Sequence, residues 1–345
     1  MRGGMKAAAV LAVAAMALAA CGGGSGTGGS DKQSVKVGLA YDIGGRGDKS
    51  FNDAAFAGLE KVKADLNVET RDLSAKSNEP DSDKEERLRL LAEGGYDPVV
   101  AVGFAYAGPL EKVAAEFPDV KFAIIDGVVA KAPNVSSLTF AEEQGSFLVG
   151  AAAALKSKTG NVGFVGGCRV PLIEKFDAGF TAGAEAVQQD IRVQSKYLST
   201  TAQNCSGFND PAAGRTTATG MYEAGADVVF HAAGGSGGGV FQAAKAAGAL
   251  AIGVDSDQYE TADAAVRDVI LTSMLKRVDV AVFDFVKGNA DGEFAPGVRV
   301  FDLKADGVGY ATSGGRVDDI KSQLDDYKQQ IIDGKITVPT KPSAP

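Results

Sequence analysis

The sequence has 345 residues, 45% of them hydrophobic and 23% charged, which is typical of globular proteins long enough for two domains. Its net charge of -9 argues against nucleic acid as a partner, because phosphate contacts need clustered lysine and arginine. A single histidine, His231, excludes a multi-histidine metal site and argues against a histidine-based catalytic centre, so we interpret it as a residue at a strand end.

The chain begins with a segment typical of secreted proteins. Arg2 and Lys6 precede an apolar run that is too short to span a bilayer as a resident helix. The run ends in Leu-Ala-Ala-Cys, whose cysteine is Cys21, and this motif resembles the lipidation site of bacterial lipoproteins. We predict a signal peptide over residues 1–20, lipid attachment at Cys21 and a flexible linker over residues 21–34. The protein would then be anchored at the extracytoplasmic face of the cell membrane; the alternative is an ordinary signal cleavage site that contains a cysteine.

A strand, a loop and a helix are predicted within the segment VGLAYDIGGRGDKSFNDAAF, which starts at Val37. An apolar run predicts a buried strand that ends before Asp42, and three glycines then allow a tight loop. Ser50 is predicted to cap the helix that follows. Because ligands of open α/β sheets bind at the carboxyl ends of strands, Asp42 and Phe51 are expected where a ligand would bind.

The same loop differs from a phosphate-binding loop at two decisive positions. A phosphate-binding loop ending at Lys49 and Ser50 needs two glycines where this chain has Ile43 and Asp48. A carboxylate beside the lysine opposes an anionic ligand. We therefore exclude the binding of a nucleoside triphosphate at this loop.

Apolar runs and amphipathic segments alternate from Val35 onward, as in the βαβ units of parallel sheets. The first series predicts strands over 35–41, 67–72, 98–102, 121–125 and 136–140 and helices over 50–65, 80–93 and 108–117. A long helix rich in small residues is predicted over 141–156. The second series predicts strands over 161–166, 191–199, 227–231, 250–254 and 269–272 and helices over 173–189, 211–224, 238–247 and 258–267.

These series predict an α/β protein with two doubly wound parallel-sheet lobes, joined by a hinge and separated by a cleft at their carboxyl edges. A helix over 274–288 and a strand over 298–303 are predicted to cross between the lobes, and a last helix is predicted over 317–333. The predicted N-terminal lobe comprises residues 35–140 and 273–296, the C-terminal lobe comprises residues 141–272 and 297–335, and residues 336–345 are predicted to be disordered.

Several residues with functional side chains follow predicted strands, where the cleft would lie. They are Asp126, Phe176, the glycine run that begins at Gly234, Asp255 and Lys276. Each aspartate has an alternative interpretation as a helix cap, each phenylalanine as a core residue, and the glycine run as a tight turn. Asp255 also begins a sequence like a calcium loop, but a later ligand and the glycine of that loop are missing. We predict no metal site and no cofactor.

Six segments together resemble one family. They are VGLAYDIGGRGDKSFNDAAFAGL, FAIIDG, EEQGSFLVGAAAAL, GFVGGCRVPLIEKFDAGFTAGA, DVVFHAAGGSGGGVFQAAK and GVDSDQY. Over residues 35–338 the chain is similar to the basic membrane protein family of lipoproteins, which includes the purine nucleoside receptors of ABC importers. The resemblance implies a type I periplasmic-binding-protein fold, in which a three-stranded hinge joins two lobes. The GGC at residues 166–168 departs from the family, because Cys168 is not a general feature of it.

The resemblance also implies a ligand and a role for each site residue. Phe51 and Phe176 would sandwich the base of a purine nucleoside, and Asn52 and Asp126 would bind its polar edges. The rest of the site would be lined by Asp42, Gly234, Asp255 and Lys276, the last two near the ribose.

We expect a binding protein that closes over its ligand and presents it to the permease of an ABC transporter, and we expect it to be a monomer. One alternative is a binder of a sugar or a signalling molecule with the same fold, since pentose binders also stack rings on aromatic side chains. A less favoured alternative is a nucleoside hydrolase, which would need a carboxylate cluster with a metal or a histidine base. Neither is evident in the sequence, so we predict that the protein is not an enzyme.

Two cysteines remain once Cys21 is assigned to the lipid, and both follow strands of the predicted second lobe. Loops after parallel strands leave a sheet at the same edge, and disulfides persist outside the cytoplasm. We predict a disulfide between Cys168 and Cys205, with two free thiols as the alternative.

Overall fold

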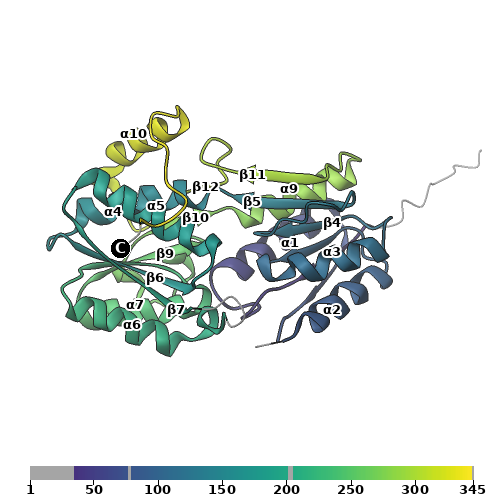
Figure 1. The fold of residues 1–345 in the computed structure, drawn as a ribbon, viewed down its shortest axis with the longest axis horizontal. Helices are drawn as coiled ribbons and strands as arrows, with labels where there is room; N and C mark the ends of the chain where they lie inside the picture. The colour runs from purple at the N-terminus through teal and green to yellow at the C-terminus, as the bar shows by residue number, and fades with distance from the viewer. Residues whose placement is uncertain (1–34, 77–78, 201–204, 344–345) are drawn as a thin grey trace, which may run out of the picture. The chain divides into compact units, whose positions relative to one another are not determined.

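The computed structural model describes residues 35–76, 79–200 and 205–343. The predicted signal peptide, Cys21 and the linker lie outside these residues and stay predictions. The described residues form two six-stranded sheets, each with helices on both faces (Figure 1).

The first sheet is parallel throughout and forms the core of the first lobe. Its strand order is β2-β1-β3-β4-β5-β11. The strands are β1 (Lys36–Ala40), β2 (Glu69–Leu73), β3 (Val99–Val102), β4 (Phe122–Ile125), β5 (Val135–Phe140) and β11 (Gly297–Phe301). Helices α1 (Phe51–Leu66) and α9 (Val278–Ala290) pack on one face, and α2 (Asp81–Glu93) and α3 (Ala107–Glu116) pack on the other. The central strands β3 and β4 are buried along their whole length, which explains their unbroken apolar sequences.

The second sheet repeats this arrangement except at one edge. Its order is β7-β6-β8-β9-β10-β12, and β12 alone runs antiparallel to its neighbour. The strands are β6 (Asn161–Cys168), β7 (Arg192–Ser199), β8 (Val228–Ala232), β9 (Leu250–Asp255), β10 (Ile270–Lys276) and β12 (Val308–Tyr310). Helices α4 (Glu142–Lys156) and α5 (Pro171–Val187) cover one face, and α6 (Pro211–Glu223) and α7 (Gly237–Ala247) cover the other (Figure 1). The short α8 (Gln258–Thr261) follows β9, and α10 (Lys321–Ile332) is the last helix. The prediction of two parallel α/β lobes is confirmed.

Within the described residues the chain passes between the two sheets three times. It passes after β5 at Ala141, after β10 at Arg277 and after β11. Backbone hydrogen bonds hold these segments together: the N–H of Ala141 donates to Phe301 O at 3.0 Å, and that of Arg277 donates to Gly307 O at 2.8 Å. The three connections occupy the position expected for the hinge.

The predicted lobe boundaries are wrong at two strands. The predicted first lobe included residues 273–276, but these belong to β10 of the second sheet, and α9 begins only at Val278. The predicted second lobe included residues 297–301, but these form β11, which pairs with β5 of the first sheet. The side chains of an edge strand do not specify which sheet it joins; the pairing of its backbone decides.

Other local predictions also need correction. The helix predicted over 258–267 ends at Thr261, and the short β12 has no counterpart among the predicted strands. The predicted disordered tail includes Val338, which is buried in the core of the second lobe, so the prediction does not hold at this residue.

Helices α4 and α5 approach each other closely because glycines line their contact. A Cβ added at Gly183 would lie 1.9 Å from the carbonyl oxygen of Phe147, and one added at Gly150 would lie 2.1 Å from that of Phe180. Side chains at these positions would force the helices apart. The small residues that the sequence shows in α4 therefore serve helix packing beside the hinge.

Candidate functional site

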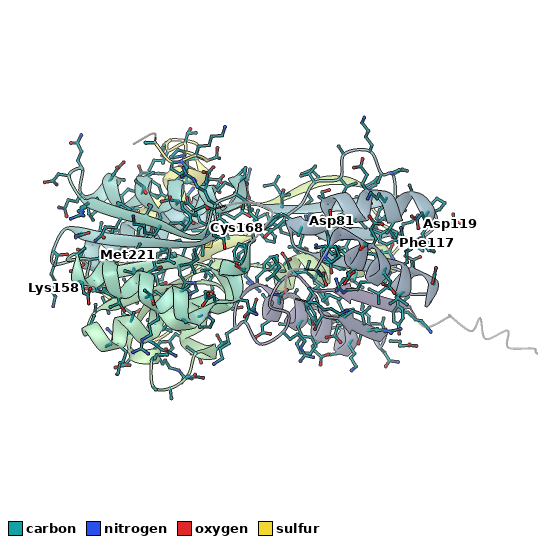
Figure 2. All side chains as sticks on the ribbon, turned by 60° about the horizontal axis from the view of Figure 1, so that its bottom comes forward. Asp81, Phe117, Asp119, Lys158, Cys168 and Met221 are labelled. Carbon is teal, nitrogen blue, oxygen red and sulfur yellow. A yellow bond between two sulfur atoms is a disulfide. The ribbon has the colours of Figure 1, made fainter. Side chains whose placement is uncertain are left out.

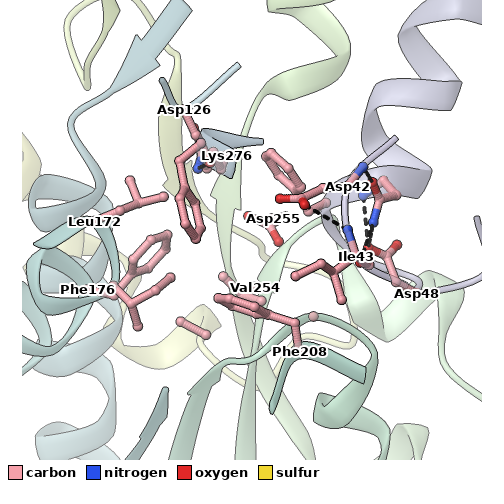
Figure 3. Close-up of a pocket in the computed structure, with 16 residues that line it drawn as sticks. Asp42, Ile43, Asp48, Asp126, Leu172, Phe176, Phe208, Val254, Asp255 and Lys276 are labelled. Carbon is pink, nitrogen blue, oxygen red and sulfur yellow. Dashed lines mark hydrogen bonds and ion pairs between the residues drawn. The ribbon is translucent and has the colours of Figure 1, made fainter. Parts of the chain in front are cut away.

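A pocket lies where residues of the two lobes meet at the carboxyl ends of the strands (Figure 3). It is narrow, with about 60 Å³ of space that the centre of a water molecule can occupy. All eight residues predicted from the sequence line it: Asp42, Phe51, Asn52, Asp126, Phe176, Gly234, Asp255 and Lys276. Eight further residues complete the wall: Ile43, Asp48, Phe104, Leu172, Ile173, Phe208, Ala232 and Val254.

Lys276, the last residue of β10, is the only cation among these pocket residues. Its ammonium group donates to Asp126 Oδ2 at 2.5 Å and lies 3.2 Å from Glu142 Oε1. Glu142 is fully buried at the first turn of α4 and also accepts a hydrogen bond from Lys175 at 3.0 Å. Burial opposes the charge of Lys276, but the carboxylates of Asp126, Glu142 and Asp255 outweigh this effect and raise its pKa. Lys276 is therefore a fixed cation and hydrogen-bond donor at the pocket wall.

Asp255 joins the two lobes. It ends β9 in the second lobe, and its Oδ2 accepts a hydrogen bond from the hydroxyl of Ser50 in the first. Two further bonds cross at this point: Ser256 Oγ donates to Ser50 O at 3.1 Å, and Gln258 Nε2 donates to Lys49 O at 2.9 Å. Burial raises the pKa of Asp255 to about 7, although Lys276 acts in the opposite direction.

Ser50, the residue predicted to cap α1, does not do so. Ser50 makes no capping hydrogen bond, because its hydroxyl is used by Asp255. Asp48 instead accepts from the backbone N–H groups of Ser50, Asn52 and Asp53 at 2.9–3.1 Å. Its carboxylate accepts hydrogen bonds from amides at the start of α1 that have no partner within the helix. Its negative charge also lies at the positive end of the helix dipole, which stabilises the helix.

Asn52 lines the pocket, but its side-chain amide already has partners within the first lobe. Its Oδ1 accepts from the N–H of Asp42 at 3.1 Å, and its Nδ2 donates to Ile43 O at 3.3 Å and to Asp48 at 3.1 Å. Both amide hydrogens are therefore occupied. This geometry favours a role for Asn52 in fixing the loop of Asp42 over a direct contact with a ligand.

Asp42 follows β1 and offers a second carboxylate to the pocket. Its Oδ1 accepts from the N–H of Ile43 at 2.7 Å, and burial raises its pKa to about 7. Burial likewise raises the pKa of Asp126 to about 6, against the attraction of Lys276. Hydrogen-bond acceptors thus line the pocket at two sides, around Asp42 and around Asp126 (Figure 3).

Four phenylalanine rings contribute the largest apolar surfaces of the pocket. Phe51 and Phe104 come from the first lobe, and Phe176 and Phe208 come from the second. Phe176 is only 3% exposed, whereas the other three rings are partly exposed. The ammonium of Lys276 lies 5.1 Å from the ring centroid of Phe51 and 5.6 Å from that of Phe176. The pocket therefore combines flat apolar surfaces with a small number of fixed polar groups.

Sequence reasoning missed Phe104, Phe208 and Asp48. Phe104 comes two residues after β3, so the rule that placed Asp42 and Asp126 at the site would also have found it. Phe208 lies well beyond the end of β7, in the short helix η2 (Ser206–Asn209), and only its closeness to Cys205 singles it out. The sequence pattern predicts no pocket role for Asp48, because its carboxylate only argues against a bound phosphate.

The described residues show no cluster of histidine, cysteine, aspartate or glutamate that would hold a metal ion. In the same part of the chain no helix combines the length and apolar character needed to cross a membrane.

Comparison with known proteins identifies the family. Residues 35–342 match the family described as "ABC transporter substrate-binding protein PnrA-like". The chain belongs to this family. A relative from Lactococcus lactis, described as the ABC transporter nucleoside-binding protein BmpA, is 35% identical over 96% of this chain and 99% of its own. A relative from Pyrococcus abyssi, described as an uncharacterized lipoprotein, is 36% identical over 85% of this chain and 73% of its own.

A solved structure agrees with this membership. An ABC transporter solute-binding protein from Aeropyrum pernix superimposes with a TM-score of 0.77 at 30% identity, covering 90% of this chain and 94% of the other. The fold is that of type I periplasmic binding proteins. As a PnrA-like protein, the chain is a solute-binding component of an ABC transporter and not an enzyme.

Proposed function

We propose that this PnrA-like protein binds a purine nucleoside in the pocket between its lobes and delivers it to the permease of an ABC importer. The observation that carries the proposal is the combination of Phe51 with Phe176 and Phe208 across one pocket whose polar groups include Asp126, Asp255 and Lys276. The nucleoside-binding description of the Lactococcus lactis relative supports the same substrate class.

The rings would provide much of the affinity. Stacking of a base on an aromatic side chain contributes about 1–3 kcal/mol, and a micromolar dissociation constant corresponds to about 8 kcal/mol. Phe51 of the first lobe would stack on one face of the base, and Phe176 and Phe208 of the second lobe would contact the other. Because the rings come from different lobes, a base between them would favour the closed arrangement of the lobes.

The polar groups would select the ligand. Asp126 would accept hydrogen bonds from N–H groups of the base, and Asp255 and Lys276 would bind ribose hydroxyls through charge-assisted bonds. A site that pairs such hydroxyls rejects analogues without them, so a free base would bind more weakly than its nucleoside. Asp42, Asp48, Asp126 and Asp255 outnumber Lys276, so a 5′-phosphate would meet net negative charge and nucleotides would be excluded.

Calorimetry with inosine, guanosine, adenosine, cytidine, ribose and GMP tests the proposal. We expect micromolar or tighter binding of at least one purine nucleoside and no binding of GMP. Phe51→Ala should weaken that binding by roughly tenfold or more. Ribose binding without a nucleoside signal would favour a sugar-binding function, and equal binding of GMP and guanosine would contradict the charge argument. Mass spectrometry of ligand retained through purification would identify the natural solute.

We also propose that Cys21 carries a lipid that holds the protein at the extracytoplasmic face of the cell membrane. The motif before Cys21 and the lipoprotein description of the Pyrococcus abyssi relative support this localisation. Membrane fractionation of cells producing wild-type or Cys21→Ala protein tests it. The wild type should sediment with membranes and the variant should not.

A further inference from the structure

Gly166, Gly167 and Cys168 form the end of β6, and the structure shows what this end contacts. It lies against η2, the short helix that carries Phe208 to the pocket. Figure 2 shows Cys168 on the side of the second lobe toward the first, whereas Lys158 lies at the far side of that lobe. We propose that Gly167, Cys168 and Cys205 are positioning residues for ligand binding, which fix Phe208 at the pocket wall. This inference rests on the proposed nucleoside function.

A covalent bond joins the two segments. A disulfide links Cys168, the last residue of β6, to Cys205, which directly precedes η2, as predicted from the sequence. Both cysteines are buried in the core of the second lobe. The bond therefore attaches the start of η2 to the sheet three residues before Phe208.

Two glycines allow η2 to lie directly on the strand. A Cβ added at Gly167 would lie 2.4 Å from Cδ1 of the Phe208 ring, so any other residue at this position would displace the ring. A Cβ added at Gly207 would lie 2.1 Å from the carbonyl oxygen of Gly167. Glycine at both positions is thus required for this contact between η2 and β6.

Hydrogen bonds extend the same wall to Gly234. Ser236 Oγ donates to Gly207 O at 2.7 Å and accepts from the N–H of Asp210 at 2.7 Å. Ser236 belongs to the short helix η3 (Gly234–Ser236), whose first residue lines the pocket. The wall formed by η2 and η3 is therefore attached to the sheet through the disulfide.

A four-residue helix has little stability of its own, so its placement depends on these contacts. A side chain that is already fixed loses less conformational entropy when a ligand binds, and each immobilised side chain costs about 0.5–1.5 kcal/mol. Without the disulfide, Phe208 would have to be ordered by the ligand. We expect the affinity for the nucleoside to fall by about two- to tenfold, mainly through faster dissociation.

The test uses the purine nucleoside that the wild type binds most tightly. Its affinity and dissociation rate are measured for each variant at a temperature well below the melting temperature of that variant. The variants are Cys168→Ala with Cys205→Ala, Phe208→Ala, and all three substitutions together. If the cysteines act through Phe208, the effects are not additive, and Phe208→Ala costs less affinity without the disulfide than with it. A purely structural disulfide would give additive effects, which would overturn the inference.

Gly167→Ala tests the contact between Gly167 and the Phe208 ring while the disulfide stays intact. This variant also provides a test if the cysteine variant does not fold. We expect it to displace the Phe208 ring and weaken binding by at least twofold. Gly220→Ala is the matched control, because its added Cβ would meet nothing within 4 Å beyond the backbone of its own helix, and it should bind like the wild type. Unchanged affinity in Gly167→Ala overturns the inference. A wild type that binds no nucleoside contradicts the proposed function itself, a result distinct from failure of the positioning role.

Discussion

Asp126 and Asp255 occupy equivalent places in the two sheets. Asp126 follows β4, Asp255 ends β9, and these strands hold the same position in the order of their sheets. Both residues have left-handed backbone conformations, with φ of 65° and 63°. Aspartate and asparagine tolerate this conformation better than most residues, so Asp→Asn is the substitution that removes the charge with least disturbance of the backbone.

The affinity for a nucleoside should increase with pH. Burial raises the pKa of Asp255 to about 7, with Lys276 lowering it and Asp126 and Asp48 raising it. A ribose hydroxyl donates to the ionised carboxylate, so the protonated form present at low pH binds less well. One group with this pKa changes from mostly protonated at pH 6 to mostly ionised at pH 8, which predicts about tenfold tighter binding.

Titration calorimetry at several pH values checks this dependence. Asp255→Asn should bind more weakly than the wild type and show a shallower dependence on pH, because Asp42 still titrates. A wild-type affinity that is constant or falls between pH 6 and pH 8 would contradict the role assigned to Asp255.

Lys276→Met should abolish measurable nucleoside binding and also destabilise the protein. The substitution leaves Asp126 and Glu142 buried without the cation that lies between them. Breaking a buried ion pair by removing one partner costs about 3–5 kcal/mol. Urea unfolding gives the stability and calorimetry the affinity. Lys158→Met, at an exposed position, is the control and should change neither the stability nor the affinity. A Lys276→Met protein as stable as the wild type would show that the ion pairs of Lys276 with Asp126 and Glu142 contribute little.

Loss of the disulfide should lower the free energy of unfolding. Cys168 and Cys205 are 37 residues apart, and the chain-entropy estimate for a loop of this length is about 3–4 kcal/mol. The measurement is urea unfolding of the wild type and of the variant with alanine at both positions. A difference below about 1 kcal/mol would mean that the unfolded chain gains little freedom when the bond is absent.

Two glycine substitutions should have opposite effects on stability. Gly183→Ala places a Cβ 1.9 Å from the backbone oxygen of Phe147, so α4 and α5 must separate, at a cost of about 1–3 kcal/mol. Gly220 lies in an exposed part of α6, where an added Cβ has free space around it. Because alanine has the better helix propensity, Gly220→Ala should stabilise the protein by up to about 1 kcal/mol. Thermal unfolding of both variants checks the sign. Equal changes would indicate that α4 and α5 adjust without strain.

The pattern of the sequence predicts the lobes because parallel strands buried on both faces are strongly apolar. It predicts a strand at β11 but assigns it to the wrong lobe, because β11 is an edge strand, with Val298 and Val300 more than half exposed, and its side chains do not specify which sheet it joins. At the site, the topology predicts the residues that come directly after strands, such as Asp126. Phe208 does not, because its place depends on a disulfide and on two glycines far apart in the sequence, contacts that only the folded chain brings together.

Three passages between the sheets have a mechanical consequence for an anchored receptor. Because the number is odd, the described chain begins in one lobe at β1 and ends in the other, where Lys341 and Pro342 lie against β7 and α5. An attachment upstream of Val35 would hold only the first lobe. The second lobe, with Phe176, Phe208 and the disulfide, would then be the part that swings relative to the bilayer when solute is captured or released, and a fluorescent label near Lys341 would report that motion.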